Sequence, residues 1–403
     1  MIMQEADEWF RRGFQRDLEG YFLDALASHD RALEIKPDFP EVWYNRGVVL
    51  WNLERHEEAI ASFDRALEIK PDDYEVWFYR GNILRNLERY EEAIASYDRA
   101  LEIKPDFHDA WYNRGVVLRR LERYEEAIAS YDRALEIKPD LHEAWDNRGV
   151  MLGILERIED ALASYDRALE IKPDDHSVWF NRGAVLGNLE RLLMAIASYD
   201  RALEIKPDYH SVWYNRGVML GNLERYEEAI ASFDRALEIK PDDHLAWYNR
   251  GVTLSNLERY EEAIASYDRA LEIKPDYHSV WYNRGVMLGN LERYEEAIAS
   301  FDRALEIKPD DHLAWYNRGV TLSNLERYEE AIASYDRALE IKPDYHSVWY
   351  NRGNALGKLE RYEEAIASFD RALEIKPGYY EAWYNRGLAL RKLERYEEEI
   401  ASF

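Results

Sequence analysis

The sequence predicts an all-α protein, a solenoid of 34-residue helix-turn-helix repeats. Three observations predict this fold: a proline that recurs every 34 residues, two helical stripes in each period, and a link between them that is too short for anything but a tight turn. The prolines stand at positions 37, 71, 105, 139, 173, 207, 241, 275, 309, 343 and 377. A fixed period of this length indicates small units that stack into an array. Function is therefore expected on the surface of one continuous array, because no single unit can hold a buried active site.

Residues 210–243 show how one repeat is built, and we number repeat positions from His210 as position 1. The first helical stripe has spacings of three and four residues: Trp213, Arg216, Leu220 and Leu223. The second stripe has similar spacings: Tyr226, Ala229, Ile230, Phe233, Ala236 and Leu237. Because the link over residues 223–226 is so short, the two helices should be antiparallel.

The residues at the helix ends agree with this assignment. Pro241 is expected to end the second helix, and the Asp242–Asp243 pair offers a cap for the first helix of the next repeat. Glu227 and Glu228 would fall in the first turn of the second helix and Lys240 in its last turn. Both placements suit the helix dipole, which favours negative charge at the start of a helix and positive charge at its end.

Small residues are expected to bring the paired helices close together. Gly217 and Ala229 would let the two backbones approach, while Trp213 and Phe233 fill the space beside them. This pattern resembles the tetratricopeptide repeat (TPR), in which Trp, Gly, Leu, Ala, an aromatic residue, Ala and Pro stand at the same offsets. The resemblance covers residues 6–403 and is to an array of bacterial type. It implies a right-handed superhelix whose first helices line the concave side.

The resemblance also divides the chain and exposes one departure. Residues 1–39 are expected to form a divergent N-terminal capping repeat, residues 40–379 ten repeats of 34 residues, and residues 380–403 a truncated twelfth. Position 15, where the family favours glycine, is Gly20 in the first repeat and glutamate, such as Glu224, in the others. If the turn needs a left-handed conformation, each glutamate lowers the folding stability by about 1 kcal/mol relative to glycine.

Composition narrows the partners and excludes several chemistries. The chain has 53 basic and 80 acidic residues, and its net charge of −27 argues against nucleic acid and membrane surfaces as partners. It has no cysteine, no secretory signal and no apolar run that could span a bilayer, so a cytoplasmic protein is expected. Eight histidines share position 1, but stacked helices stand about 8–10 Å apart, which is too far for shared zinc ligands. We expect no metal and no cofactor.

Asparagine at position 6 is the strongest functional signal. It recurs in ten repeats, and a second asparagine at position 13 lies on the same helical face. An amide offers a donor and an acceptor, which match a peptide group whatever its side chain. The predicted peptide-binding asparagines are Asn181, Asn215, Asn249, Asn283, Asn317 and Asn351 at position 6, and Asn222, Asn256 and Asn290 at position 13. The alternative is that duplication copied a harmless polar residue.

This row resembles the asparagine ladder in the superhelix of the O-linked N-acetylglucosamine transferase, which implies amides that hold the backbone of an extended peptide. A tyrosine stands one position before an asparagine at Tyr214, Tyr248 and Tyr282. These rings would add contact area for the peptide, or else they would pack between neighbouring helices. Residues 210–277 and 278–345 are identical, so they cannot each read a different ligand side chain. They can read a peptide backbone, which itself repeats.

Other residues of the repeats suggest further contacts. The arginine at position 7 should pack its stem and pair its head with a carboxylate such as Asp234 or its equivalent in a neighbouring repeat. Small residues such as Gly221 would let a ligand backbone come close, and arginines such as Arg391 would hold acidic groups at the rims. Leu192, Leu193 and Met194 replace the usual Tyr-Glu-Glu, and this apolar patch indicates either an assembly contact or sequence drift.

The sequence therefore predicts a scaffold and no enzyme. Any residue proposed as catalytic would exist in eight to twelve copies, which is the opposite of an active site. The leading hypothesis is a protein-interaction scaffold that binds an extended polypeptide or protein in its concave groove. One alternative is a homo-oligomer assembled through the apolar patch and the chain end at Phe403. Another is the recognition or regulatory arm of a larger enzyme whose catalytic domain is absent here.

Overall fold

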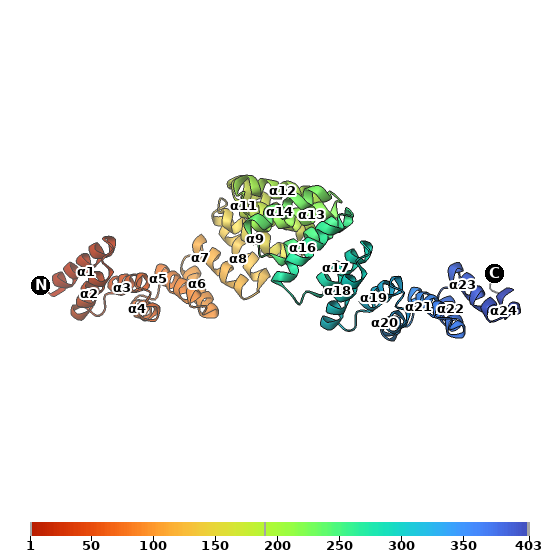
Figure 1. The fold of residues 1–403 in the computed structure, drawn as a ribbon. Coiled ribbons are helices and arrows are strands. Elements are labelled where there is room, and N and C mark those ends of the chain that lie inside the picture. Colours follow the sequence, from red (N-terminus) through yellow and green to blue (C-terminus); the bar gives the residue numbers. More distant parts are fainter. Residues whose placement is uncertain (1, 189–190, 401–403) are drawn as a thin grey trace. The chain divides into compact units, whose positions relative to one another are not determined.

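The computed structural model describes residues 2–188 and 191–400, and over these ranges the chain forms 24 α-helices and no strand. The helices follow one another as antiparallel pairs, one pair to each 34-residue repeat, along the whole described chain (Figure 1). This confirms the predicted all-α repeat fold. Two compact units, residues 1–205 and 206–403, are distinguished by their internal contacts, and each is described by itself.

Each repeat has a first helix of 13 residues and a second helix of 14, except at the two chain ends. In the first unit the helices are α1 (Ile2–Leu18), α2 (Phe22–Ile35), α3 (Pro40–Asn52), α4 (His56–Ile69), α5 (Tyr74–Asn86), α6 (Tyr90–Ile103), α7 (His108–Arg120), α8 (Tyr124–Ile137), α9 (His142–Ile154), α10 (Ile158–Ile171), α11 (His176–Asn188) and α12 (Leu192–Ile205). In the second unit they are α13 (His210–Asn222), α14 (Tyr226–Ile239), α15 (His244–Asn256), α16 (Tyr260–Ile273), α17 (His278–Asn290), α18 (Tyr294–Ile307), α19 (His312–Asn324), α20 (Tyr328–Ile341), α21 (His346–Lys358), α22 (Tyr362–Ile375), α23 (Tyr380–Lys392) and α24 (Tyr396–Ile400).

Neighbouring repeats pack unevenly within each unit. Each second helix contacts the first helix of the following repeat, and the first helices of adjacent repeats, such as α15 and α17, also contact each other. Among the described residues, the backbones of second helices of adjacent repeats lie farther apart, and ion pairs such as Arg89 with Glu57 join them at their starts. The first helices therefore lie on the inner, more closely packed side of each unit, where their side chains can act on one ligand together.

In the first eleven repeats, glycine at position 8 lies against a large ring side chain of the second helix. A β-carbon at Gly217 would lie 2.7 Å from Cε1 of Phe233, whose side chain is 1% exposed. The close approach is thus between a first-helix backbone and an aromatic ring of the second helix, where the sequence suggested two approaching backbones. Trp213 is only partly buried, and its indole N–H donates to the carbonyl of Pro207 at 2.8 Å. This bond anchors the first helix to the preceding loop.

The turn between the paired helices has a left-handed conformation at position 15, so the condition on which the cost of glutamate depended is met. Ten described glutamates have φ between 56° and 60°, and Gly20 has φ 79°. The N–H of Glu224 donates to the carbonyl of Gly221 at 3.0 Å, and the N–H of Arg225 donates to that of Leu220 at 2.9 Å. These two bonds form a Schellman motif, in which glycine is the preferred residue at the left-handed position.

The helix ends are capped as expected in some repeats only. The carboxylate of Asp243 accepts hydrogen bonds from the N–H groups of Leu245 and Ala246, so the predicted cap is confirmed at α15, and Asp311 caps α19 in the same way. Tyrosine, phenylalanine or leucine holds the corresponding position in several other repeats and supplies no side-chain cap. Lys240 lies at the C-cap, just after the last residue of α14, so its predicted place in the last turn is wrong.

Candidate binding face of the first helices

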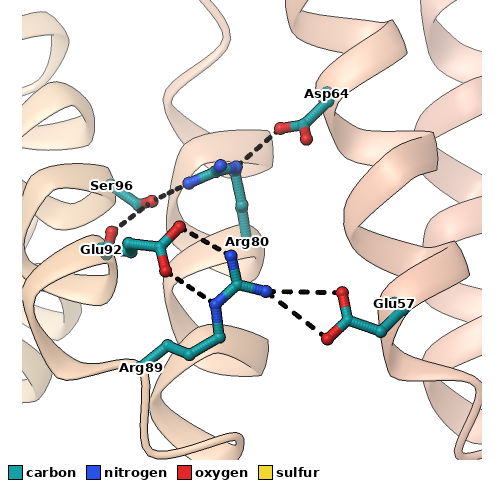
Figure 2. Close-up of polar contacts among 6 residues, drawn as sticks. All are labelled: Glu57, Asp64, Arg80, Arg89, Glu92 and Ser96. Carbon is teal, nitrogen blue, oxygen red and sulfur yellow. Dashed lines mark hydrogen bonds and ion pairs between the residues drawn. The ribbon is translucent and has the colours of Figure 1, made fainter.

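The arginine at position 7 joins three helices from two repeats. Arg80 on α5 donates from Nε to Asp64 on α4 at 2.7 Å and from Nη1 to Ser96 on α6 at 2.7 Å (Figure 2). The Ser96 hydroxyl donates in turn to the carbonyl of Glu92 at 2.9 Å. Arg250 makes the predicted pair with Asp234, with 2.6 Å between Nε and Oδ1. The structural role expected for this arginine is confirmed, and its charge is neutralised within the array.

The predicted asparagines and tyrosines form pairs across repeat boundaries. In the second unit the asparagine Nδ2 donates to the hydroxyl of the tyrosine 35 residues earlier in five pairs. We call four of these pairs rungs, and their N–O distances are Asn249 to Tyr214 at 3.0 Å, Asn283 to Tyr248 at 3.3 Å, Asn317 to Tyr282 at 2.9 Å and Asn351 to Tyr316 at 3.0 Å. In the fifth pair, Asn385 donates to Tyr350 at 3.1 Å and also to Oδ1 of Asn354 at 2.9 Å. Sequence reasoning treated the two residue types separately and missed this pairing, although their constant separation was a signal for it.

Each rung leaves one donor and one acceptor unused within the described protein. The tyrosine oxygen accepts from asparagine, and burial raises the pKa of Tyr214 above its usual value, so the hydroxyl keeps its own proton. No donor among the described residues reaches Oδ1 of the paired asparagine in these four rungs. A rung thus presents a hydroxyl donor and a carbonyl acceptor, both of them half-buried on the first helices.

The asparagines of the first unit differ in their acceptor atoms, although Asn147 also donates to the hydroxyl of Tyr112 at 3.2 Å. Arg85 donates to Oδ1 of Asn113 at 2.7 Å, and Arg119 donates to Oδ1 of Asn147 at 2.9 Å. These two acceptors are therefore occupied by the protein itself. Asn181, one of the predicted binding residues, donates to the carboxylate of Asp146 at 3.0 Å. The open rungs accordingly belong to the second unit. Asn215, on α13 at the start of that unit, is half-buried.

The second asparagine row lines a series of small cavities together with the first row. Asn222 and Asn249 share a cavity of about 130 Å³, and Asn290 and Asn317 share one of about 150 Å³. Asn256 lines the rim of the first of these and is exposed. A β-carbon added at Gly221 or Gly289 would meet nothing within 4 Å, so there is unfilled space next to these two glycines. The structure thus brings members of the two predicted rows, such as Asn222 with Asn249 and Asn290 with Asn317, to the same openings between adjacent repeats of the second unit.

At least six of the eight histidines at position 1 contact the following repeat. Nε2 of His210 lies 3.0 Å from the carboxylate of Asp243, and His278 makes the same contact with Asp311. The ring of His244 instead packs edge-on against that of Tyr277. Over residues 2–188 and 191–400, no group of three or more potential ligands could hold a metal ion. These histidines therefore connect repeats along the array.

The apolar patch at the start of α12 is exposed. Leu193 and Met194 are 66% and 49% exposed, while Leu192 is half-buried. Because Met194 replaces the usual glutamate, Arg191 lacks its usual partner and pairs with Glu159 of the preceding repeat at 2.6 Å. Whether the patch contacts another molecule stays a prediction, and Phe403, the other predicted assembly residue, lies outside the described residues.

Comparison with known proteins gives consistent matches to one family. Models described as tetratricopeptide repeat match residues 40–73, 210–243, 244–277, 278–311, 312–345 and 346–379, with further matches over 70–106, 78–142, 176–209 and 368–401. A model described as TPR repeat matches residues 154–190. No curated protein sequence matches the chain. None of the described helices is both long enough and apolar enough to cross a membrane.

Several solved structures are similar in fold. YrrB, described as a TPR protein with an unusual peptide-binding site, is 27% identical over 46% of this chain and 95% of its own, with a TM-score of 0.43. MamA from Desulfovibrio magneticus is 20% identical over 42% of this chain and 96% of its own, with a TM-score of 0.41. A tetratricopeptide repeat protein from Parabacteroides merdae is 17% identical over 62% of this chain and 99% of its own, with a TM-score of 0.46.

Proposed function

Because the chain belongs to the tetratricopeptide repeat family, we propose that it is a protein-interaction scaffold that holds an extended polypeptide along the first helices of its second unit. The observation that carries this proposal is the series of four rungs, in which each tyrosine–asparagine pair leaves a donor and an acceptor unused. A peptide group offers the complement, an N–H donor and a carbonyl acceptor.

The rungs change the binding mode that the sequence suggested. A single amide was expected to supply both the donor and the acceptor, but one N–H of each asparagine is already used by tyrosine. In the proposed mode, the ligand N–H donates to asparagine Oδ1 and the ligand carbonyl accepts from the tyrosine hydroxyl. Both contacts are to main-chain groups, which agrees with two identical 68-residue blocks that present the same rungs twice.

The charge of this face also suits a peptide backbone. Each of the four helices α13, α15, α17 and α19 contains one charged residue, the arginine at position 7. That arginine is directed to the second helices, where its Nη1 donates to a serine such as Ser232 or Ser266. The acidic residues that produce the net charge of −27 lie elsewhere in these repeats. A neutral polar segment therefore meets no unfavourable charge along the rungs.

The proposal is tested by removing the four rung asparagines together. Replacing Asn249, Asn283, Asn317 and Asn351 by alanine should abolish binding of a fluorescein-labelled, uncharged peptide, measured by fluorescence anisotropy, while far-UV circular dichroism stays unchanged. A control variant with alanine at Asn52, Asn86 and Asn188, which lie at position 13 in the first unit, should bind as the parent does. Equal binding by the parent and the rung variant would refute the proposal.

Exposure of the apolar patch supports self-assembly as a second candidate function. If Leu193 and Met194 form a contact between copies, the mass measured by sedimentation equilibrium should fall on dilution. The variant Leu193→Glu with Met194→Glu should then be monomeric at every concentration. A parent protein that is monomeric throughout would exclude this function. A role as the arm of a larger enzyme and a cytoplasmic location stay predictions.

A further inference from the structure

The first and the sixth repeats each lack one half of an ion pair that the other repeats share. In ten repeats an arginine at position 16 pairs with an acidic residue at position 19, with N–O distances of 2.5–2.7 Å. In the first repeat Tyr21 replaces the arginine, and Asp24 keeps the acidic position. In the sixth repeat Arg191 keeps the basic position, and Met194 replaces the acidic residue. One repeat therefore has the acid without its arginine, and the other has the arginine without its acid.

These two unmatched charges are exposed and have unused hydrogen-bonding capacity. The carboxylate of Asp24 forms no hydrogen bond or ion pair with any described residue. Arg191 donates from Nη2 to Glu159 at 2.6 Å, and no described residue accepts from its Nε or Nη1. A guanidinium group can bind a carboxylate through two parallel N–H groups. Because α2 and α12 are five repeats apart and do not contact each other, Asp24 and Arg191 cannot pair within one chain.

An open groove lies beside Asp24, at the turn of the first repeat. It has a volume of about 370 Å³, and we call it the N-terminal groove. The groove is lined by Gly20, Tyr21, Phe22, Leu23, Asp24 and Leu53. Tyr21 and Leu23 are 56% and 68% exposed, and a β-carbon at Gly20 would meet nothing within 4 Å. Since an apolar cavity of about 150 Å³ holds a benzene molecule, the N-terminal groove has room for a leucine or methionine side chain.

The apolar patch at the start of α12 has matching chemistry. Leu193 stands at position 18, where the first repeat has Leu23 and every other repeat has glutamate. The exposed side chains of Leu193 and Met194 follow directly after Arg191. The apolar patch and the N-terminal groove therefore each combine exposed apolar side chains with one unmatched charge, and the two charges have opposite signs.

We propose that the apolar patch of one copy of this chain binds the N-terminal groove of a second copy, with Arg191 of the first copy paired to Asp24 of the second. This inference rests on self-assembly, the second candidate function, and identifies the surface that receives the patch. Patch against patch would bring two copies of Arg191 together, and groove against groove two copies of Asp24, so like charges disfavour both arrangements. The contact is thus heterologous: it buries two different apolar surfaces against each other and completes the missing ion pair.

The test uses two variants that restore the common residues of the repeat and so keep the fold. The patch variant, Leu193→Glu with Met194→Glu, removes the apolar side chains and supplies Arg191 with its usual acidic partner. The groove variant, Tyr21→Arg with Leu23→Glu, supplies Asp24 with its usual arginine. Sedimentation equilibrium in about 0.15 M salt, where the Debye length is about 8 Å, should show an associating parent and a monomer for each variant alone. An equimolar mixture of the two variants should form complexes of two copies and nothing larger, because only one patch and one groove in each complex are intact.

Two further variants separate the contact from general effects of charge. Leu245→Glu with Leu313→Glu makes the same change in net charge as the patch variant, at side chains that are 40% and 39% exposed on α15 and α19, and should associate as the parent does. Asp24→Arg should weaken association at least about tenfold, because it places an arginine against Arg191. Adding Arg191→Asp to that variant should recover the association, because the ion pair is then present with its charges exchanged.

The mixture and the groove variant decide the inference. It is overturned if the groove variant associates as the parent does, if the mixture of the two variants stays monomeric, or if the control at Leu245 and Leu313 loses association as fully as the patch variant. A parent that is monomeric at every concentration would refute self-assembly itself. An associating parent whose patch variant is monomeric and whose groove variant still associates would refute this inference alone.

Discussion

Glutamate in the turn between the paired helices should cost stability that glycine would restore. Ten described glutamates hold φ between 56° and 60°, a region in which the β-carbon of an L-residue is crowded by backbone oxygen. The strain is about 1 kcal/mol or more for each residue, and glycine removes it but loses more backbone entropy on folding. The expected net gain is about 0.5–1 kcal/mol for each turn.

The cleanest test uses two turns with identical flanking sequences, at Glu258 (φ 57°) and Glu326 (φ 59°). Both side chains are exposed, so little besides the backbone should change. Because the sites are two repeats apart, their effects should add, and the double glycine variant should gain about 1–2 kcal/mol in the free energy of unfolding. The measurement is the midpoint of urea unfolding followed by circular dichroism, with the dependence on urea concentration compared between variants.

Two controls separate turn strain from other effects of the substitution. Glu258→Ala keeps the β-carbon and should give no comparable gain. Glu261→Gly, in the first turn of α16, places glycine in a right-handed helix and should lower stability by up to about 1 kcal/mol. The reasoning is refuted if the glycine variant of both turns unfolds at the same urea concentration as the parent, with an unchanged slope, or at a lower one.

Two further predictions concern the packing of the core. Gly217→Ala should lower the free energy of unfolding by about 1–3 kcal/mol, because the new β-carbon would lie 2.7 Å from Phe233. Gly221→Ala places its β-carbon in open space and should raise the free energy of unfolding by about 0.5–1 kcal/mol. Equal urea midpoints for the two variants would contradict this prediction. His29 is fully buried without a hydrogen-bond partner among the described residues, and burial lowers its pKa from 6.5 to about 4. Below pH 6.5 the imidazole of His29 is protonated in the unfolded chain, while in the folded chain it stays neutral down to about pH 4. The free energy of unfolding therefore falls by up to about 3 kcal/mol as the pH is lowered from 6.5 to about 4. His29→Phe should abolish that part of the acid sensitivity, measured as melting temperature against pH, and an unchanged pH profile would contradict the assignment.

Much of the repeat could be predicted because its signals are local or strictly periodic. The signals involve only a few neighbouring residues, as at Pro241, at the short link near Glu224 and in the stripe that contains Phe233. In the structure, α14 ends shortly before Pro241, and the turn has its left-handed residue at Glu224. The pairing of Arg250 with Asp234 was also accessible, because a half-buried arginine needs a carboxylate and one recurs at a constant distance. The error at Lys240 is one of a single residue at a helix end, where the pattern is weakest.

The candidate site could be predicted only in part. The two asparagine rows were found from their constant spacing. Their hydrogen-bond partners were not, because the sequence does not give the orientation of a side-chain amide. The structure shows that Asn317 is held by Tyr282, while Asn147 is occupied by Arg119. The same residue type at the same repeat position therefore has an open acceptor in one unit and an occupied one in the other.

The sequence by itself determined the repeat and its two antiparallel helices, since both follow from short-range chemistry copied along the chain. Only the tertiary structure decided which copies are equivalent. The rungs are each built from side chains of adjacent repeats, such as Asn317 with Tyr282. Their properties depend on distances between helices that no single repeat contains, which is the physical reason why the pattern of one repeat could not reveal them.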